Sequence, residues 1–367
     1  MHIYLDNIIF SLQKHGGISV VWYEFIKRIL VDSDFNCEFI ELPNQNNLRA
    51  QLDIPSASIL KNNLSYLPLK IQRYINPKVS SNKCIFHSSY FRTVDNPNVL
   101  NITTVHDFIY EYFVTGLPQK IHACQKGNAI KHSKKIICVS KNTKYDLFKF
   151  YPQIKEEQVE VIYNGVSEDY FPIIQTERIS IVDLIPFQRG EYVIYVGERK
   201  SEYKNFKLVV EACLLAKYPL VIVGGGSLTS DENKFLAMKL GTNKFKQLMG
   251  IRNSELNQLY NQAAFLIYPS IYEGFGIPIL EAQKAGCPVI CSNTSSIPEV
   301  AGQDAFLLDH INAEQIAEIL LTNKSRSTFV TNIIREGFVN AERFSWDQCY
   351  KQTKQLYSDI YSEYFSK

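Results

Sequence analysis

Two glutamates eight positions apart, Glu273 and Glu281, flank a turn that contains two glycines. An apolar run at 265–268, typical of a buried strand, precedes this turn, and a helix is predicted at 277–285 because Pro278 suits a first helical turn. Strand, glycine turn and helix together bring free backbone N–H groups and the positive end of a helix dipole to one point, which suits a phosphate. Carboxylates beside that point can accept hydrogen bonds from sugar hydroxyls. The pattern therefore predicts a sugar-nucleotide site.

Positive charge for such a ligand is predicted from a second loop, where Arg199, Lys200 and Lys204 follow an apolar strand at 192–196. The diphosphate of a nucleotide-sugar gains charge as it leaves, and Arg and Lys side chains can meet that charge in place of a divalent metal. Arg199 and Lys204 are the predicted cations, with Lys200 as an alternative to Lys204. We expect no metal and no other cofactor.

Composition narrows the class of protein. The chain has 367 residues, of which 46% are apolar, so two domains with buried cores are expected. A net charge of +2 argues against nucleic acid as a partner. The eight cysteines are scattered without a Cys-x-x-Cys pattern, which favours reduced thiols over disulfides or zinc ligands. The sequence predicts neither a membrane span nor a signal peptide. These features favour a cytoplasmic protein.

The first half of the chain predicts one doubly wound sheet. A strand at 2–5, the pair Gly16-Gly17 and an amphipathic helix from Ile18 form a typical first unit. The glycine pair either lets backbone approach a ligand or forms only a tight turn. A buried strand at 99–105 ends at His106, in the position where open α/β sheets bind ligands. His106 is therefore a candidate, although a histidine can also end a strand by chance.

The second half repeats the α/β pattern. Gly224-Gly225-Gly226 lacks the spacing of a dinucleotide fingerprint and is interpreted as a strand-end turn, which disfavours a nicotinamide oxidoreductase. Helix caps are predicted at Ser140, at Asn205, and at 253–254. Further helices are predicted near 312–322, 325–341 and 346–364.

Two basic segments in the first half leave alternatives open. The segment 66–78 mixes apolar residues with Lys70, Arg73 and Lys78, and 118–135 carries five lysines. The first is either a solvated helix packed on the sheet or a contact for an anionic membrane. The second is either a solvated helix face or a surface for an acidic or lipid-linked acceptor.

Taken together, the motifs resemble those of the retaining family-4 glycosyltransferases with the GT-B fold. The Glu273–Glu281 spacing matches the E-x7-E donor signature of that family. Other landmarks follow in order: KHGGI at 14–18, VHD at 105–107, ICVS at 137–140, VIYNGV at 161–166, YVGERKSEYKNF at 195–206 and GGG at 224–226. The resemblance spans nearly the whole chain, and EGFG at 273–276 is its most specific part.

The resemblance implies an α/β fold with two Rossmann-like doubly wound domains that face each other across a cleft. We expect an N-terminal acceptor-side domain at 1–172, a linker at 173–190 and a C-terminal nucleotide-sugar-binding domain at 191–345. The last helix, about 346–367, would cross back to the N-terminal domain.

The resemblance also implies roles for individual residues. Glu281 would hold the ribose hydroxyls and Glu273 those of the donor sugar, while Arg199 and Lys204 would neutralise the diphosphate. The implied catalytic set is His106, Arg199, Lys204 and Glu273. The implied donor-binding set is Gly17, Gly250, Ile251, Gly274, Phe275, Gly276, Ile277 and Glu281. Ser295 and Ser296 are further candidates for the diphosphate.

The implied activity is the metal-independent, retaining transfer of a hexose-type sugar in bacterial surface polysaccharide synthesis. The donor would be a UDP-, GDP- or dTDP-sugar, and the acceptor a saccharide or an undecaprenyl-linked saccharide. The enzyme would be cytoplasmic, with peripheral contact at the inner face of the plasma membrane as an open alternative. A second hypothesis is a non-catalytic sugar-nucleotide-binding subunit that supports a partner glycosyltransferase.

Overall fold

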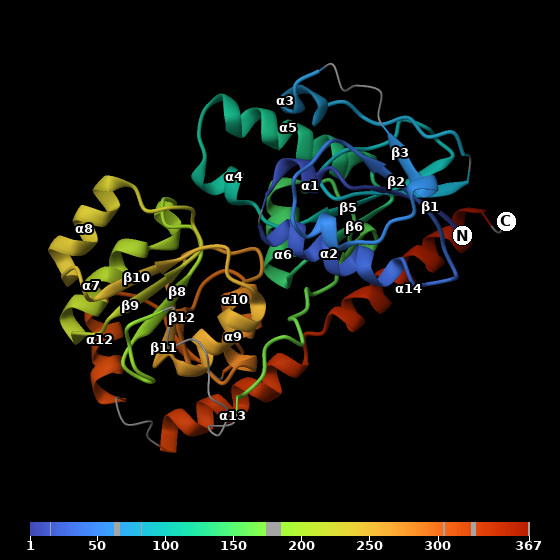
Figure 1. Cartoon of the computed structure of the whole chain (residues 1–367). Coiled ribbons are helices and arrows are strands. Elements are labelled where there is room, and N and C mark those ends of the chain that lie inside the picture. Colours follow the sequence, from blue (N-terminus) through green and yellow to red (C-terminus); the bar gives the residue numbers. More distant parts are fainter. Residues whose placement is uncertain are drawn as a thin grey trace. The chain divides into compact units, whose positions relative to one another are not determined.

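The computed structural model describes residues 1–365 except His15, 62–66, Asn82, 174–184, Asp304 and 324–327 (Figure 1). The chain divides into two compact units. The N-terminal unit comprises Met1–Gly165 and Trp346–Lys367, and the C-terminal unit comprises Val166–Ser345. The domain end predicted at 172 thus falls inside the second unit, and most of the linker predicted at 173–190 lies outside the described residues.

The N-terminal unit is built on a seven-stranded parallel sheet in the order β3-β2-β1-β4-β5-β6-β7. Strands buried on both faces explain the short, nearly continuous apolar runs of the sequence. The order reverses between β1 and β4, which makes that pair the switch point of the sheet. The strands are β1 His2–Asp6, β2 Asn36–Glu41, β3 Ile59–Lys61, β4 Cys84–Ser88, β5 Val99–Val105, β6 Lys135–Cys138 and β7 Val159–Val161.

Helices cover both faces of this sheet. The predicted cap at Ser140 is confirmed, because its side chain accepts a hydrogen bond from the Thr143 backbone N–H. The helices are α1 Ile9–Leu12, α2 Gly17–Ile29, α3 Leu69–Gln72, α4 Ile109–Phe113, α5 Leu117–His132, α6 Lys141–Phe150 and α14 Trp346–Phe365. Three 3-10 turns lie at Arg49–Gln51, Ser56–Ser58 and Glu156–Gln158.

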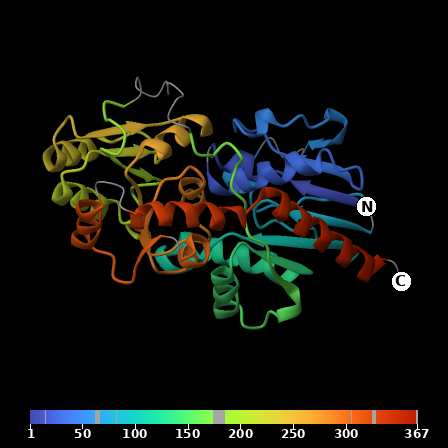
Figure 2. The same cartoon turned by 90° about the horizontal axis from the view of Figure 1, so that it is seen from below.

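The last helix, α14, belongs to the N-terminal unit, as the resemblance implied, and contacts α2 and β4 (Figure 2). Tyr357 and Ile360 are almost fully buried in the core of this unit. The Tyr357 hydroxyl lies 2.5 Å from Nδ1 of His87 on β4, and Nε2 of His87 lies 2.9 Å from Oγ1 of Thr104 on β5. A polar link therefore ties the helix to two neighbouring strands.

Replacing Tyr357 by phenylalanine is expected to lower the free energy of unfolding by about 1–2 kcal/mol. The change keeps the ring but leaves Nδ1 of buried His87 without its partner. Urea unfolding followed by circular dichroism measures the effect. Tyr361→Phe on the same helix is the control, because no hydrogen bond of its hydroxyl occurs within the described residues. Equal midpoints for both variants would contradict the prediction.

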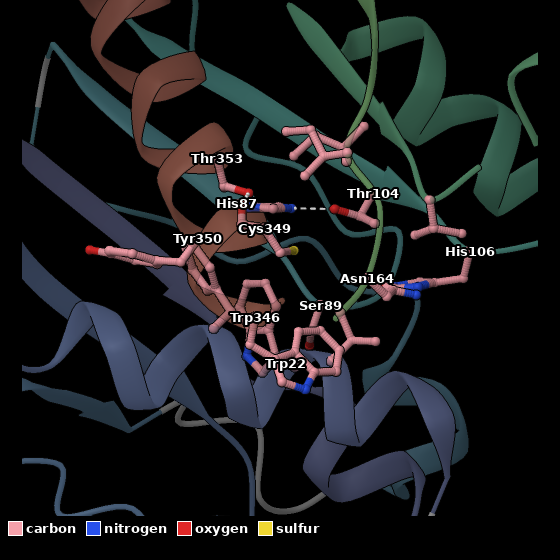
Figure 3. A pocket seen from close by; sticks show the side chains of 15 residues that line it. Trp22, His87, Ser89, Thr104, His106, Asn164, Trp346, Cys349, Tyr350 and Thr353 are labelled. Carbon is pink, nitrogen blue, oxygen red and sulfur yellow. Dashed lines mark hydrogen bonds between the residues drawn. The ribbon is translucent and has the colours of Figure 1, made fainter. Parts of the chain in front are cut away.

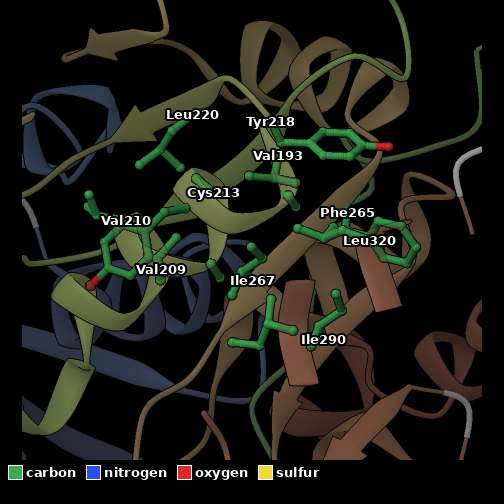
Figure 4. Close-up of a cluster of buried hydrophobic side chains, with 14 of the residues drawn as sticks. Val193, Val209, Val210, Cys213, Tyr218, Leu220, Phe265, Ile267, Ile290 and Leu320 are labelled. Atoms are coloured by element: carbon green, nitrogen blue, oxygen red, sulfur yellow. The ribbon is translucent and has the colours of Figure 1, made fainter. Parts of the chain in front are cut away.

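The C-terminal unit holds a six-stranded parallel sheet in the order β10-β9-β8-β11-β12-β13, whose switch point lies between β8 and β11. Figure 4 shows its core, in which side chains of β8, β9 and β11 pack against those of α7 and α12. The strands are β8 Val193–Val196, β9 Leu220–Val223, β10 Phe245–Leu248, β11 Phe265–Tyr268, β12 Val289–Ser292 and β13 Phe306–Leu308. The helices are α7 Phe206–Ala216, α8 Ser230–Leu240, α9 Asn253–Gln262, α10 Ile277–Lys284, α11 Ile297–Ala301, α12 Ala313–Thr322 and α13 Thr328–Glu342, with a 3-10 turn at Glu202–Lys204.

Three sequence interpretations need correction. The segment 66–78 contains only the four-residue helix α3 within its described part, which begins after Tyr66, because Pro68 and Pro77 bracket it. Asn205 does not cap α7 with its side chain. Its backbone is left-handed, with φ of 52°, and its amide donates to the Pro269 carbonyl at 3.0 Å. The cap position of α9 is Arg252 rather than 253–254.

Candidate functional site

The predicted donor-site loops of the C-terminal unit lie at one edge of its sheet. Because all six strands are parallel, the turns after β8, β10 and β11 leave from the same edge. The turn after β8 carries Arg199 and Lys204, and the turn after β11 carries Glu273. These two turns border the switch point between β8 and β11, where open α/β sheets bind ligands.

The strand, glycine turn and helix predicted from the sequence are confirmed as β11, residues 269–276 and α10. Gly276 is the N-cap of α10 and has φ of 110°, a backbone conformation that a side chain would strain. The Ser296 hydroxyl supports the turn, because it lies 2.9 and 3.0 Å from the carbonyl oxygens of Glu273 and Phe275 and can donate its single hydrogen to either. Ser296 is fully buried, so its hydroxyl supports the turn and does not face an open site.

Lys204 and Glu273 form an ion pair in which Nζ lies 2.5 Å from Oε1. Both side chains are largely buried, 15% and 9% exposed, and the Tyr268 hydroxyl also hydrogen-bonds to Glu273. The Glu273 backbone N–H donates to Oγ of Ser295 at 3.0 Å. The structure therefore brings together one predicted cation and one predicted sugar ligand at the glycine turn.

Arg199 is held differently from Lys204. Its side chain is fully buried, and the guanidinium donates to the carbonyls of Gly224 and Gly226 at 2.6 and 3.1 Å. Its Nε atom lies 3.2 Å from Oε1 of Glu232. The glycine-rich turn after β9 thus wraps around this guanidinium, and a Cβ at Gly225 would meet it at 2.5 Å. The diphosphate role of Arg199 stays a prediction, and in this conformation its donors serve the turn.

The choice between Lys200 and Lys204 is narrowed by their surroundings. Lys200 is exposed, whereas Lys204 points to Glu273 and lies over the rings of Tyr203 and Tyr268, 5.4 and 5.7 Å from their centroids. A cation that is already positioned and partly desolvated interacts more strongly with a phosphate than a solvated one. The surroundings of the two lysines therefore favour Lys204 over Lys200 as the cation for the diphosphate.

Glu281 lies on α10 between two tyrosine hydroxyls. Tyr260 donates to Oε2 of Glu281 at 3.1 Å, and Tyr170 also donates to the carboxylate. Burial raises the pKa of Glu281 from 4.5 to about 7, and the two tyrosine hydrogen bonds oppose that shift. A partly protonated carboxyl at neutral pH can be driven to its charged form by further hydrogen-bond donors, such as a pair of ligand hydroxyls.

The remaining predicted donor-binding residues occupy the same edge. Gly250, with φ of 63°, and Ile251 lie between β10 and α9, and Gly250 is exposed. Phe275 is buried against Phe344, with ring centroids 5.7 Å apart. Gly274 lies in the turn after β11, and Ile277 begins α10.

The N-terminal unit carries the other two predicted residues. Gly17 begins α2. Apart from its chain neighbours and the backbone of α2 itself, no atom of the described residues lies within 4 Å of the position that a Cβ would take there. His106 directly follows β5 and lines a small, partly open cavity of about 40 Å³ (Figure 3). Burial lowers the pKa of His106 to about 4; the adjacent Asp107 opposes this shift and Lys126 adds to it. His106 is therefore neutral at pH 7, when it can both donate and accept a hydrogen bond.

Sequence reasoning missed two buried polar residues near His106. His87 lines the same cavity, but it lies inside an apolar strand pattern that gives no functional signal (Figure 3). Lys126, interpreted as part of a solvated or binding face, is fully buried. Its Nζ atom donates to the Asp107 carbonyl and pairs with Oε2 of Glu111, both at 2.8 Å. Lys126 therefore supports the turn that carries His106.

The expectation of a site without metal overlooks one Asp-x-Asp pattern, at Asp32-Ser33-Asp34. Its two carboxylates both pair with Nζ of Lys354 on α14, at 2.7 and 2.6 Å, and Tyr350 donates to Asp32 at 2.7 Å. These acids follow α2 and fasten α14 to it. They belong to the support of the N-terminal unit rather than to either predicted site.

Comparison with solved structures defines the class of fold. Sucrose-phosphate synthase of Thermosynechococcus elongatus superimposes with a TM-score of 0.74 at 16% identity over 99% of both chains. HepE of Anabaena, solved in complex with UDP and glucose, superimposes with a TM-score of 0.73 at 16% identity, over 98% of this chain and 100% of that one. Two parallel α/β sheets and these likenesses define the GT-B fold.

Sequence comparison then gives the family. Residues 181–335 match the family described as "Glycosyl transferases group 1", and residues 82–170 match "Glycosyltransferase Family 4". The chain belongs to these glycosyltransferases. It is 27% identical over 237 residues to "O-antigen chain mannosyltransferase B" of Escherichia coli. That alignment covers 62% of this chain and 61% of the relative, so the chain spans about three fifths of the relative's length.

Proposed function

We propose that this protein transfers a hexose-type sugar from a nucleotide-sugar donor to a saccharide or lipid-linked saccharide in the synthesis of a bacterial surface polysaccharide. The observation that carries the proposal is the Lys204–Glu273 pair at the glycine turn before α10, beside the switch point of a GT-B sheet. The O-antigen mannosyltransferase relative supports the saccharide class, and the UDP complex of the HepE neighbour supports the donor class.

The chemistry follows from the charges at this edge. As the bond from the anomeric carbon to the diphosphate breaks, negative charge grows on the leaving oxygen, and the Lys204 ammonium stabilises it. The acceptor hydroxyl then forms its bond on the same face of the sugar, and its proton passes to the leaving phosphate. The configuration is retained without a protein nucleophile. Glu273 orients the donor sugar and Glu281 the ribose. For neutral His106, which follows β5, the proposed role is a hydrogen bond to a sugar hydroxyl.

A thermal-shift screen against UDP-, GDP- and dTDP-sugars, followed by transfer of the binding sugar to a saccharide panel, tests this function. We expect one donor to raise the melting temperature, and the product to keep the anomeric configuration of the donor. Transfer should persist in EDTA, because the proposed charge stabilisation uses Lys204 rather than a metal. Donor binding without transfer to any acceptor would favour the non-catalytic subunit instead. Shifts by none of the three donor classes would overturn both hypotheses.

We further propose that the enzyme is cytoplasmic and contacts an anionic membrane through exposed apolar side chains on α3, α4 and α5. Ile71 is 49% exposed, Phe113 39% and Leu117 68%, and exposed Lys131 lies on α5. Apolar insertion together with lysines suits an anionic lipid surface. No helix in the described part of the chain is long and apolar enough to cross a bilayer.

If this surface contacts the membrane, Leu117→Ser should lower co-sedimentation with phosphatidylglycerol vesicles severalfold. The substitution removes the most exposed apolar side chain of this surface. Val31→Ser is the matched control, since Val31 is 85% exposed and follows α2. Wild-type protein that fails to bind such vesicles at low salt would contradict the membrane proposal.

A further inference from the structure

Buried polar atoms without partners gather around α5 and the residues that follow α3. His122 is only 6% exposed, and its Nδ1 atom has no hydrogen-bond partner within the described part of the chain. The same is true of the buried atoms Oε1 of Gln125 and Nε of Arg73. Buried polar groups in folded proteins are nearly always paired, with protein or with ordered water, so three such atoms in one place single out this region for a closer look.

These three residues belong to one cluster. The ring of His122 stacks on Tyr110 with centroids 3.8 Å apart, and its Nε2 lies 3.0 Å from the Tyr90 hydroxyl. The Arg73 guanidinium lies over the Tyr90 ring, 5.0 Å from the centroid. Nε2 of Gln125 donates to the Arg73 carbonyl at 2.8 Å. The rings therefore fix the orientation of the polar groups.

A groove of about 440 Å³ opens beside the cluster, within the range of small-molecule sites, which is about 300–1,000 Å³. Its walls combine aromatic rings with amides and one lysine. They include Tyr74, Asn76, Phe91, Lys120, Gln125 and Asn128.

A strained turn after β4 places one of these rings. The backbone of Phe91 lies in the left-handed region, with φ of 44°, which is unusual for a bulky residue. The neighbouring Arg92 is fully buried, and its guanidinium forms an ion pair with the Asp6 carboxylate at the end of β1. The ion pair of Arg92 with Asp6, which lies at the switch point of the sheet, therefore holds the neighbouring Phe91 in place. Backbone strain that is held in this way is typical of functional sites.

We propose that this groove binds the saccharide of the acceptor, which rests on the proposed glycosyltransferase function. A sugar ring offers apolar C–H faces to aromatic rings and hydroxyls to amides, and the groove supplies both in Tyr74, Phe91 and Gln125. Burial lowers the pKa of His122 to about 3, and Lys126 and Arg73 add to this shift while Asp107 opposes it. Neutral His122 can therefore serve the Tyr90 hydroxyl as donor or as acceptor, and it helps to position the cluster beside the groove.

The groove is connected to His106 through a single turn. Tyr110 lies on α4, three residues after Asp107, and buried Lys126 ties α5 to the Asp107 carbonyl and to Glu111. A saccharide bound in the groove would therefore contact α5, the helix whose Lys126 also holds the turn that carries His106. The wall is mainly apolar and includes Ile121, but its amides and Lys120 interrupt the apolar surface. This mixture favours a saccharide over a lipid surface, which would need a continuous apolar face.

Cys124 provides a direct probe of occupancy, since it lines the groove and is the exposed one among the eight cysteines, all of which are described. A bulky maleimide should modify wild-type protein at Cys124, with Cys124→Ser reporting the background. The panel consists of methyl α-mannoside, mannobiose, methyl α-glucoside and N-acetylglucosamine. We expect at least one of them to slow the modification severalfold, and phosphatidylglycerol vesicles not to do so.

The kinetic arm compares Gln125→Leu with Gln352→Leu, an exposed glutamine on α14 outside the groove wall. Gln125→Leu should raise the KM for the acceptor at least tenfold without changing the donor-induced thermal shift, and Gln352→Leu should change neither. If Gln125→Leu does not fold, Asn128→Ala replaces it, because Asn128 is exposed in the same wall.

The experiments test the saccharide site in the groove and the proposed glycosyltransferase activity separately. Protection by vesicles instead of sugars overturns the saccharide site in favour of a lipid contact. No protection by any saccharide of the panel, or an unchanged acceptor KM in both groove variants, also overturns it. If no nucleotide-sugar binds, the proposed function fails, whereas protection of Cys124 still decides whether the groove takes a saccharide.

Discussion

Replacing Lys204 by methionine is expected to lower kcat/KM by about 10²–10³-fold, with most of the loss in kcat. Removing one preorganised group that stabilises transition-state charge costs about 2.7–4 kcal/mol in well-studied enzymes. Lys204 is suited to that role because its side chain is 15% exposed and its ammonium is held 2.5 Å from Oε1 of Glu273. Methionine keeps most of the length and the apolar character of the lysine stem, whose end lies near the rings of Tyr203 and Tyr268.

The same substitution removes the ion-pair partner of a buried carboxylate, so its effect on folding needs a separate measurement. Lys200→Met is the control, since that lysine is exposed in the same loop. Lys204→Met combined with Glu273→Gln removes the unpaired charge, and should restore stability without restoring turnover. An equal loss of kcat/KM in Lys200→Met would reject Lys204 as the diphosphate cation, and so would recovery of turnover in the double variant.

Local rules predicted the donor turn because its signals lie within a few residues of one another. Gly276, Pro278 and the apolar strand before them specify the turn and the start of α10 without any distant partner. The strand order is not local, and it places the loops after β8 and β11 on either side of the switch point. The sequence therefore identified both loops as candidates but not the pairing of Lys204 with Glu273.

The contacts that the sequence does not reveal share a physical cause, which is a partner far away in sequence. The diphosphate role of Arg199 stays a prediction, but its charge gives no sign that the guanidinium donates to carbonyls of the turn after β9. Asn205 has the composition of a cap, but its amide reaches the Pro269 carbonyl. Lys126 was placed on a solvated or binding face, although Glu111 and the Asp107 carbonyl compensate for its burial. Residue type gives no sign of such compensation.

Replacing Glu281 by glutamine is expected to weaken donor binding on the order of a hundredfold while stabilising the unliganded protein above about pH 7. A hydrogen bond to a charged group contributes about 1.5–3 kcal/mol, and a ribose offers two hydroxyls to the carboxylate. Glutamine retains one acceptor oxygen but not the charge. Titration calorimetry with the donor from the thermal-shift screen measures the affinity.

The stabilisation follows from the pKa of Glu281, which burial raises from 4.5 to about 7. Between these values the folded protein binds more protons than the unfolded chain, so the free energy of unfolding falls as the pH rises through this window. Above about pH 7 the wild type carries the full cost of about 3 kcal/mol for ionising this carboxyl in place. Glutamine has no such cost, so the variant's melting temperature should depend less on pH and exceed that of the wild type at about pH 8.

Donor binding should also release a proton near neutral pH in the wild type, because ribose hydroxyls favour the charged carboxylate. Calorimetry in buffers of different ionisation enthalpy detects that release, which should disappear in Glu281→Gln. Glu318→Gln, an exposed glutamate on α12, is the control and should match the wild type in both experiments. Parallel melting curves against pH for wild type and Glu281→Gln would show that Glu281 is already charged without donor. In that case the pKa of Glu281 could not explain a release of protons on donor binding.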